Sequence, residues 1–206
     1  MTLPAAAVVL AGGQGRRLGR DKALVELWPG LPLLARVVQV ARQLCPQVVV
    51  VTDVPGRYAG LSLPVEWAVD ALPGRGPLAG LVAGLERSAH PYALLLACDL
   101  PFLSLPLLAY MLSLPGDYQA LVPRWRGRWQ PLHAIYARSC LGPARELLAQ
   151  GEGSLHSLLA RVQVRPLYPR QVRPYDPLGL SFWDLDRPRQ LARARRLAAA
   201  LSHSGG

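Results

Sequence analysis

Short apolar runs alternate with helical patterns along most of this chain. The runs are bounded by turn residues and have the length of buried strands in a parallel sheet. Strands that alternate with helices in this way are typical of βαβ units. The pattern therefore predicts an α/β fold, in which a doubly wound, mostly parallel sheet carries helices on both faces. The strand-like runs are 5–10, 47–52, 65–69, 92–98 and 120–123, and the helical patterns are 33–44, 78–88 and 105–112.

Length and composition fit a single domain over 1–206. The 206 residues, of which 51% are hydrophobic, can bury one large core. No apolar run approaches the roughly 18 to 20 residues that a membrane span requires, and no basic flank precedes the first run, as a signal peptide would need. We therefore expect a cytoplasmic protein with no membrane partner. The stretch 164–180 carries four prolines and is predicted to be a long irregular segment.

The cysteines of the chain are expected to be reduced. Cys45, Cys98 and Cys140 are odd in number and widely spaced. This pattern fits buried core thiols better than a disulfide framework or a zinc site.

Lys22 is the only lysine in the chain, against 22 arginines, and there is no asparagine. A composition that replaces lysine so widely should keep it where arginine would not serve. An ammonium is a compact point charge that can lie against one oxygen, whereas a guanidinium is a wide planar fork. Lys22 also follows a glycine-rich turn at the end of the first strand-like run, where backbone amides and arginines favour an anion. The turn therefore predicts a phosphate site.

The glycine-rich turn matches neither of the two common nucleotide fingerprints. After Gly13 and Gly15, the third glycine of G-x-G-x-x-G would fall on Leu18. No G-x-x-x-x-G-K-[ST] motif passes through Lys22. The sequence therefore argues against a dinucleotide-dependent enzyme and against a Walker-type NTPase.

Two of the few acidic residues directly follow strand-like runs. Asp99 comes after 92–98, and Asp70 comes after 65–69, just before a second glycine-rich turn at 74–80. The carboxyl ends of parallel strands form one edge of the sheet, so both carboxylates and both turns should meet there. Magnesium prefers one or two carboxylates together with phosphate oxygens, which makes Asp99 a candidate ligand. The alternative is that Asp99 caps the next helix, although Ser104 is the better cap candidate.

The net charge of +10 favours an anionic partner, so a basic module that binds RNA or an acidic protein is an alternative to an enzyme. The arginines are scattered, however, and charge alone does not require aspartates at strand ends. We therefore expect no nucleic-acid partner. Arg189, Arg193, Arg195 and Arg196 are interpreted as the solvated face of a last helix, and Arg124, Trp125, Arg126, Arg128 and Trp129 as either a hairpin rim or a stacking surface.

Four motifs resemble those of the molybdenum cofactor guanylyltransferases, also called molybdopterin-guanine dinucleotide synthases. They are LAGGQGRRLGRDKAL at 10–24, GPLAGL at 76–81, CDLPF at 98–102 and QPLHAIY at 130–136, in the family's order and with similar spacing. The first motif alone marks the wider nucleotidyltransferase superfamily, and the four together point to the molybdopterin branch. The resemblance implies a Rossmann-like fold in which GTP and the terminal phosphate of molybdopterin, or of its molybdenum form, meet with Mg2+ as cofactor.

The resemblance also implies roles for individual residues. Arg17 takes the position of the family's loop arginine, and it joins Lys22 and Asp99 as a candidate catalytic residue. Asp99 would ligate magnesium, and Lys22 would bind phosphate. The N-terminal part would bind GTP, and 120–190 would lie mainly on the pterin side, with His133 as a neutral core histidine. The candidate nucleotide-binding residues are Leu10, Ala11, Gly12, Gly13, Lys22, Asp70 and Asp99.

The chain departs from the family pattern near its C-terminal end. Family members often carry Asn-x-Asn-Thr-Pro where this chain reads Asp-Leu-Asp-Arg-Pro at 184–188. An aspartate is a charged metal ligand, so Asp184 or Asp186 is a candidate for a second magnesium contact. The related cytidylyltransferases of molybdopterin often carry an aspartate pair there, so CTP as donor, or a sugar phosphate as acceptor, is the alternative. Either Thr52 or Asp53 is the polar residue expected near the nucleotide.

The expected partners are GTP and molybdopterin or the molybdenum cofactor. Transient contacts with cofactor-synthesis proteins or acceptor apoenzymes are compatible with this role. No apolar seam is left over once the core is assigned, so a monomer is expected.

Overall fold

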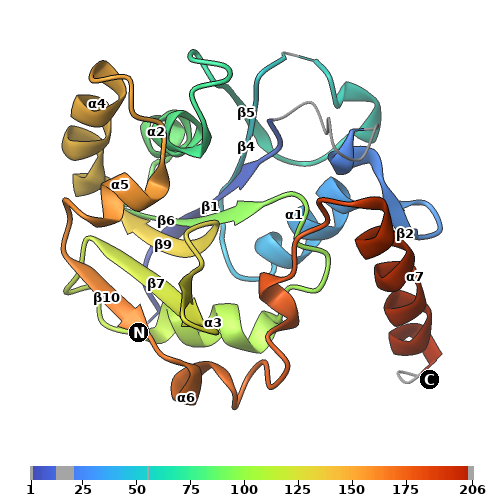
Figure 1. Ribbon diagram of the computed structural model, residues 1–206. Coiled ribbons are helices and arrows are strands. Elements are labelled where there is room, and N and C mark those ends of the chain that lie inside the picture. Colours follow the sequence, from blue (N-terminus) through green and yellow to red (C-terminus); the bar gives the residue numbers. More distant parts are fainter. Residues whose placement is uncertain (1, 13–20, 55, 204–206) are drawn as a thin grey trace.

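The computed structural model of the protein describes residues 2–12, 21–54 and 56–203. Within these ranges, eight strands form one sheet through the middle of the molecule (Figure 1). The strand order is β10-β7-β9-β6-β1-β4-β5, and β8 pairs with β7. The strands are β1 (Ala5–Leu10), β4 (Val48–Thr52), β5 (Glu66–Val69), β6 (Tyr92–Ala97), β7 (Ala120–Trp125), β8 (Arg128–Trp129), β9 (His133–Ala137) and β10 (Val164–Leu167).

The sheet is mostly parallel. β1 pairs in parallel with β4 and with β6, β4 pairs with β5, and β10 pairs with β7. β9 runs antiparallel to its neighbours β6 and β7. The predicted fold class is therefore confirmed, and the five predicted strands correspond to β1, β4, β5, β6 and β7 with small differences at their ends.

Helices cover both faces of the sheet (Figure 1). Val8 and Val9 of β1 belong to two separate core clusters, because consecutive side chains of a strand point to opposite faces. α1 (Leu33–Arg42) and α3 (Leu105–Ser113) pack on the Val9 side, and α2 (Pro77–Arg87), α4 (Leu141–Ala149) and α5 (Leu155–Leu159) pack on the Val8 side. The three predicted helices are α1, α2 and α3. Ser104, not Asp99, caps α3, because its hydroxyl accepts a hydrogen bond from the Leu107 N–H.

Two parts of the predicted layout are wrong. No predicted strand covers β9, whose five residues are all buried and show no apolar–polar alternation. The stretch 164–180 contains β10, the short helix α6 (Pro169–Val172) and the first residue of the turn η4 (Leu180–Phe182). Its prolines are compatible with these elements, since Pro166 lies on an edge strand and Pro169 is the first residue of α6.

The two basic groups of the sequence lie on a hairpin and on the last helix. β7 and β8 form the hairpin, and its turn residues Arg126 and Gly127 both have positive φ, 49° and 77°, as a type I′ turn requires. α7 (Pro188–His203) packs beside β2 (Glu26–Trp28), which pairs with β3 (Leu31–Pro32). The arginines of α7 that were singled out are exposed, which confirms the solvated-face interpretation: Arg189, Arg193, Arg195 and Arg196.

The cysteines are free and buried, as predicted. Burial raises the pKa of Cys45 and of Cys140 to about 12, and it also raises the pKa of Cys98. All three thiols therefore stay protonated at neutral pH. Within the described ranges, no helix is both long and apolar enough to cross a membrane.

Two glycines allow α2 to approach the central strand closely. A Cβ atom on Gly80 would lie 2.9 Å from a methyl carbon of Leu10, and one on Gly84 would overlap the side chain of Val8. The GPLAGL motif therefore has a packing role. It brings the N-terminal end of α2 to the carboxyl end of β1, where the first glycine-rich turn begins.

Candidate active site

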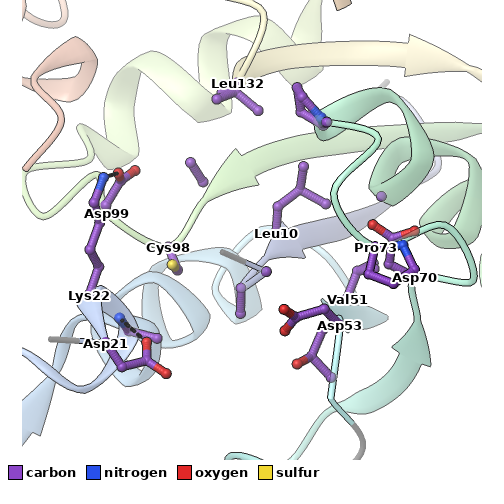
Figure 2. A pocket seen from close by; sticks show the side chains of 18 of the residues that line it. Leu10, Asp21, Lys22, Val51, Asp53, Asp70, Pro73, Cys98, Asp99 and Leu132 are labelled. Atoms are coloured by element: carbon purple, nitrogen blue, oxygen red, sulfur yellow. Dashed lines mark hydrogen bonds and ion pairs between the residues drawn. The ribbon is translucent and has the colours of Figure 1, made fainter. Parts of the chain in front are cut away.

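A cleft of about 840 Å³ lies at the carboxyl ends of β1, β4, β5 and β6. Parallel α/β sheets bind their ligands at this edge. Figure 2 shows Lys22 and Asp99 at one end of the cleft, Asp53 and Asp70 at the other, and Leu10 between them. The predicted residues that line the cleft are Leu10, Ala11, Gly12, Lys22, Asp70 and Asp99. Gly13 and Arg17 lie outside the described residues.

Lys22 lies between two carboxylates that are far away in the sequence. Its Nζ donates a hydrogen bond to Asp99 Oδ2 at 2.8 Å and a second one to Asp186 Oδ1. Burial disfavours the ammonium, but the two carboxylates outweigh burial and raise the pKa of Lys22. Lys22 is therefore a fixed cation at neutral pH. An ammonium has three N–H donors, and two of them bond carboxylates among the residues that the structure describes.

Asp186, rather than Asp184, is the C-terminal aspartate that contacts Lys22. The side chain of Gln190 on α7 accepts hydrogen bonds from the backbone N–H groups of Asp186 (3.0 Å) and Arg187 (2.7 Å). These bonds fix the backbone where the chain enters α7. The side chain of Asp184 lies at the surface and is covered only in part. This partial burial, together with the charges of Asp186 and Asp99, raises the pKa of Asp184.

The segment before Asp186 is fastened to the loop after β6. The buried carboxylate of Asp176 accepts hydrogen bonds from the backbone N–H groups of Leu180 (3.0 Å) and Ser181 (2.9 Å). The Ser181 hydroxyl accepts from the Ser104 N–H at 2.8 Å. The Trp183 ring stacks on Phe102 at a centroid distance of 5.7 Å, and Arg193 lies over Trp183. Since Phe102 and Ser104 closely follow Asp99, this packing holds the two carboxylates near each other.

Polar groups at the other end of the cleft come from β4 and β5. Thr52 and Asp53, the two candidates for the polar residue expected near the nucleotide, both line the cleft. The Thr52 hydroxyl is within 3.3 Å of both the N–H and the carbonyl of Val54, and Asp53 pairs with Arg57 at 2.7 Å. Asp70 accepts a hydrogen bond from the Leu72 N–H at 2.9 Å, which shapes the start of the second glycine-rich turn.

The described part of the cleft is acidic. Its lining residues within the described ranges include five aspartates and one lysine. A polyanionic ligand such as a nucleoside triphosphate would meet net repulsion from these groups alone. Binding such a ligand here therefore calls for additional positive charge. Within the described part of the chain, no three histidine, cysteine or acidic side chains are grouped as a complete metal site.

The second glycine-rich turn is held by a distant glycine that the sequence motifs do not include. The Gly153 carbonyl accepts a hydrogen bond from the Leu78 N–H at 3.1 Å, in the first turn of α2. A Cβ atom on Gly153 would overlap the Arg75 carbonyl, and one on Gly76, where φ is +86°, would lie 2.8 Å from the Gly153 carbonyl oxygen. The cleft-lining turn thus depends on a loop between α4 and α5.

Replacing Gly153 with alanine should destabilise the protein by about 1–3 kcal/mol, the usual cost of forcing extra volume into a packed contact. The matched control is Gly142→Ala on α4, where a Cβ would meet nothing within 4 Å and φ is not in the left-handed region. Denaturant unfolding of the two variants checks this. Equal stability of both variants would contradict the close contact between Gly153 and Arg75.

His133 is a core residue, as expected. It is 1% exposed, and burial lowers its pKa to about 4, so the imidazole is neutral at physiological pH. Its ring meets Phe182 edge-on at a centroid distance of 5.0 Å. His133 does not line the cleft, although its neighbour Leu132 does.

Three polar residues close to Lys22 were not singled out from the sequence. They are Asp21, whose carboxylate accepts a hydrogen bond from the Tyr58 hydroxyl and pairs with Arg57, and these two partners. Asp21 stands next to Lys22 in the sequence. It is the N-cap residue of a short helical turn, and aspartate is one of the residue types preferred at that position. Nothing in the local sequence around Tyr58 indicates that it reaches this site.

The chain is similar to known nucleotidyltransferases over most of its length. Residues 7–166 match the MobA-like NTP transferase domain family. The molybdenum cofactor guanylyltransferase of Desulfosudis oleivorans is 30% identical, over 91% of this chain and 92% of that protein. A probable molybdenum cofactor guanylyltransferase of Chloroflexus aggregans is 35% identical, over 89% of this chain and 90% of that protein.

Solved structures agree with these sequence matches. Molybdopterin-guanine dinucleotide biosynthesis protein A from Archaeoglobus fulgidus superimposes with a TM-score of 0.82 and 28% identity, covering 95% of this chain and 99% of that one. The extent of these matches, together with the lysine and the strand-end aspartates in the cleft, identifies the family of this chain. This chain belongs to the MobA-like NTP transferase family and, within it, to the molybdenum cofactor guanylyltransferases.

Proposed function

We propose that this protein transfers GMP from GTP to the terminal phosphate of molybdopterin, or of its molybdenum form, and releases pyrophosphate. The product would be the guanine dinucleotide form of the cofactor. The observation that carries the proposal is the meeting of Lys22 with Asp99 and Asp186 in a cleft at the carboxyl edge of the sheet. The names of relatives that match about nine-tenths of the chain support the choice of donor and acceptor.

The reaction would be an in-line displacement at the α-phosphorus of GTP. The attacking group is an ionised phosphate, so the reaction needs no strong general base, and positioning and charge neutralisation must supply most of the acceleration. Lys22 is held as a cation at one end of the cleft and can offset charge on the phosphates and the departing pyrophosphate. The same role is proposed for Arg17. We assign the nucleotide to the N-terminal part and the pterin mainly to 120–190.

Asp99 and Asp186 fit a magnesium ion that completes its shell with phosphate oxygens. Both carboxylates contact the same ammonium, so their oxygens converge on one small region of the cleft. A pair of carboxylates with phosphate oxygens and water is the donor set that Mg2+ prefers. A magnesium ion held by Asp99 and Asp186 would supply positive charge that offsets the charge of the phosphates. The acidity of the cleft supports this proposal, because a triphosphate needs a counter-charge there.

The test is pyrophosphate release from GTP, CTP, ATP and UTP, with and without molybdopterin and magnesium. We expect release only when GTP, molybdopterin and magnesium are all present. Release with CTP in place of GTP would keep the fold and the site but change the donor. The aspartates at 184 and 186 are the observation that favours this second candidate. Release with none of the four nucleotides would overturn the proposal for molybdopterin as acceptor.

A further inference from the structure

The hydroxyl group of Tyr58 links two residues that line the cleft, Ala11 and Asp21. The tyrosine side chain is buried, at 2% exposure, in the segment after β4. The hydroxyl lies 2.9 Å from the Ala11 carbonyl oxygen, and 3.0 Å and 3.2 Å from the two carboxylate oxygens of Asp21. Its single proton is therefore shared between the end of β1 and the residue that precedes Lys22.

Asp21 controls the backbone from which Lys22 extends. Its Oδ1 accepts a hydrogen bond from the Ala23 N–H at 3.0 Å and so caps η1 (Lys22–Leu24), the short helical turn that starts with Lys22. Arg57 Nε lies 3.8 Å from Asp21 Oδ2, and the same guanidinium pairs with Asp53. The carboxylate of Asp21 is thus held from two sides, by a phenol and by a cation.

The tyrosine itself has little freedom. Its ring belongs to the core cluster under α1 and stacks on Trp67 of β5 at a centroid distance of 6.3 Å, with the ring planes 23° apart. Burial, and then the charge of Asp21, raise the pKa of Tyr58, so the hydroxyl keeps its proton over the working pH range of an enzyme. A rigid donor of this kind fixes the orientation of its acceptor.

We propose that Tyr58 is a positioning residue, which acts through Asp21 to hold Lys22 in its place between Asp99 and Asp186. The inference rests on the proposed function for its kinetic test, but the contacts that carry it are independent of the substrate. Tyr58 does not line the cleft, whereas Asp21 and Lys22 do. Its contribution is therefore to geometry and not to substrate contact.

The experiment compares Tyr58→Phe with Tyr92→Phe. Each change removes one hydroxyl that bonds a backbone carbonyl, since the Tyr92 hydroxyl donates to the Gly116 carbonyl at 2.6 Å. Tyr92 is the first residue of β6, at the end of the strand away from the cleft. We expect Tyr58→Phe to lower kcat about tenfold, as for a lost hydrogen bond to a charged group, with KM for GTP changed by less than about threefold. Tyr92→Phe should keep kcat.

A second readout does not depend on activity. Lys22 is the only lysine, so a protein labelled with [ζ-15N]lysine gives one side-chain ammonium signal. We expect this signal to shift or broaden in Tyr58→Phe and to stay unchanged in Tyr92→Phe. Asp21→Ala should show the same change, and the double variant should be no slower than Asp21→Ala alone, because the two residues act as one unit.

The outcomes separate this proposal from the proposed function. An unchanged ammonium signal in Tyr58→Phe, with the same kcat as Tyr92→Phe, would overturn the positioning role. Additive losses in the double variant would also overturn it. If the wild-type protein released no pyrophosphate from GTP, the proposed function would fail, and the ammonium signal would still decide whether Tyr58 positions Lys22.

Discussion

Replacing Lys22 with alanine should lower turnover about 100-fold or more, which is the usual scale for the loss of one preorganised electrostatic donor. Lys22 is the one cation among the cleft-lining residues within the described ranges. Its removal leaves the carboxylates of Asp99 and Asp186 facing each other and takes away charge that would offset the phosphates. Single-turnover kinetics with GTP, molybdopterin and magnesium at saturating concentrations would measure the effect on chemistry.

Two variants control for simpler explanations of that result. Arg189→Ala removes one positive charge from the exposed face of α7, so it changes the net charge equally and should keep full turnover. Lys22→Arg keeps the charge but replaces a point charge by a planar fork, and we expect it to stay well below wild type. Near-normal turnover in Lys22→Ala would remove Lys22 from the reaction.

The sheet edge that carries the cleft could be predicted because its position follows from general rules. A buried run followed by glycine or aspartate marks the carboxyl end of a parallel strand, and all such ends lie on one edge. Asp70 and Asp99 were found in this way, and both line the cleft. β9 escaped prediction because its sequence, HAIYA, starts with a histidine and lacks the continuous aliphatic run by which the other buried strands, β1, β4 and β6, were recognised.

The contacts that complete the site could not be predicted, because they join segments whose mutual position depends on the folded chain. Asp186 is 164 positions away from Lys22, and it arrives there through the packing of Ser181 and Trp183 on the loop after β6. Gly153 meets the second glycine-rich turn through the placement of α4 and α5. No local sequence pattern specifies such long-range contacts, since each depends on tertiary packing.

Asp99→Asn should abolish magnesium-dependent activity, with turnover reduced by about 1,000-fold or more at any magnesium concentration. Asparagine is nearly isosteric with aspartate, but its amide is neutral and offers one oxygen, whereas the carboxylate offers two oxygens that share a negative charge. Asp99 lies two residues after the end of the buried strand β6, and its Oδ2 accepts a hydrogen bond from Lys22. Magnesium titration of pyrophosphate release, together with magnesium binding measured by calorimetry, would separate loss of the metal from loss of the ion pair.

Two matched substitutions make the assignment of Asp99 specific. Asp186→Asn introduces the residue that the resembled family often carries, so it should keep most of the activity and require moderately more magnesium. Asp70→Asn makes the same chemical change at the other end of the cleft, and it should raise KM for GTP without changing the magnesium dependence. If Asp99→Asn kept full rate at low magnesium, the metal would have to lie elsewhere. If Asp186→Asn were as inactive as Asp99→Asn, the two carboxylates would share the metal equally, because a neutral amide would then fail at either position.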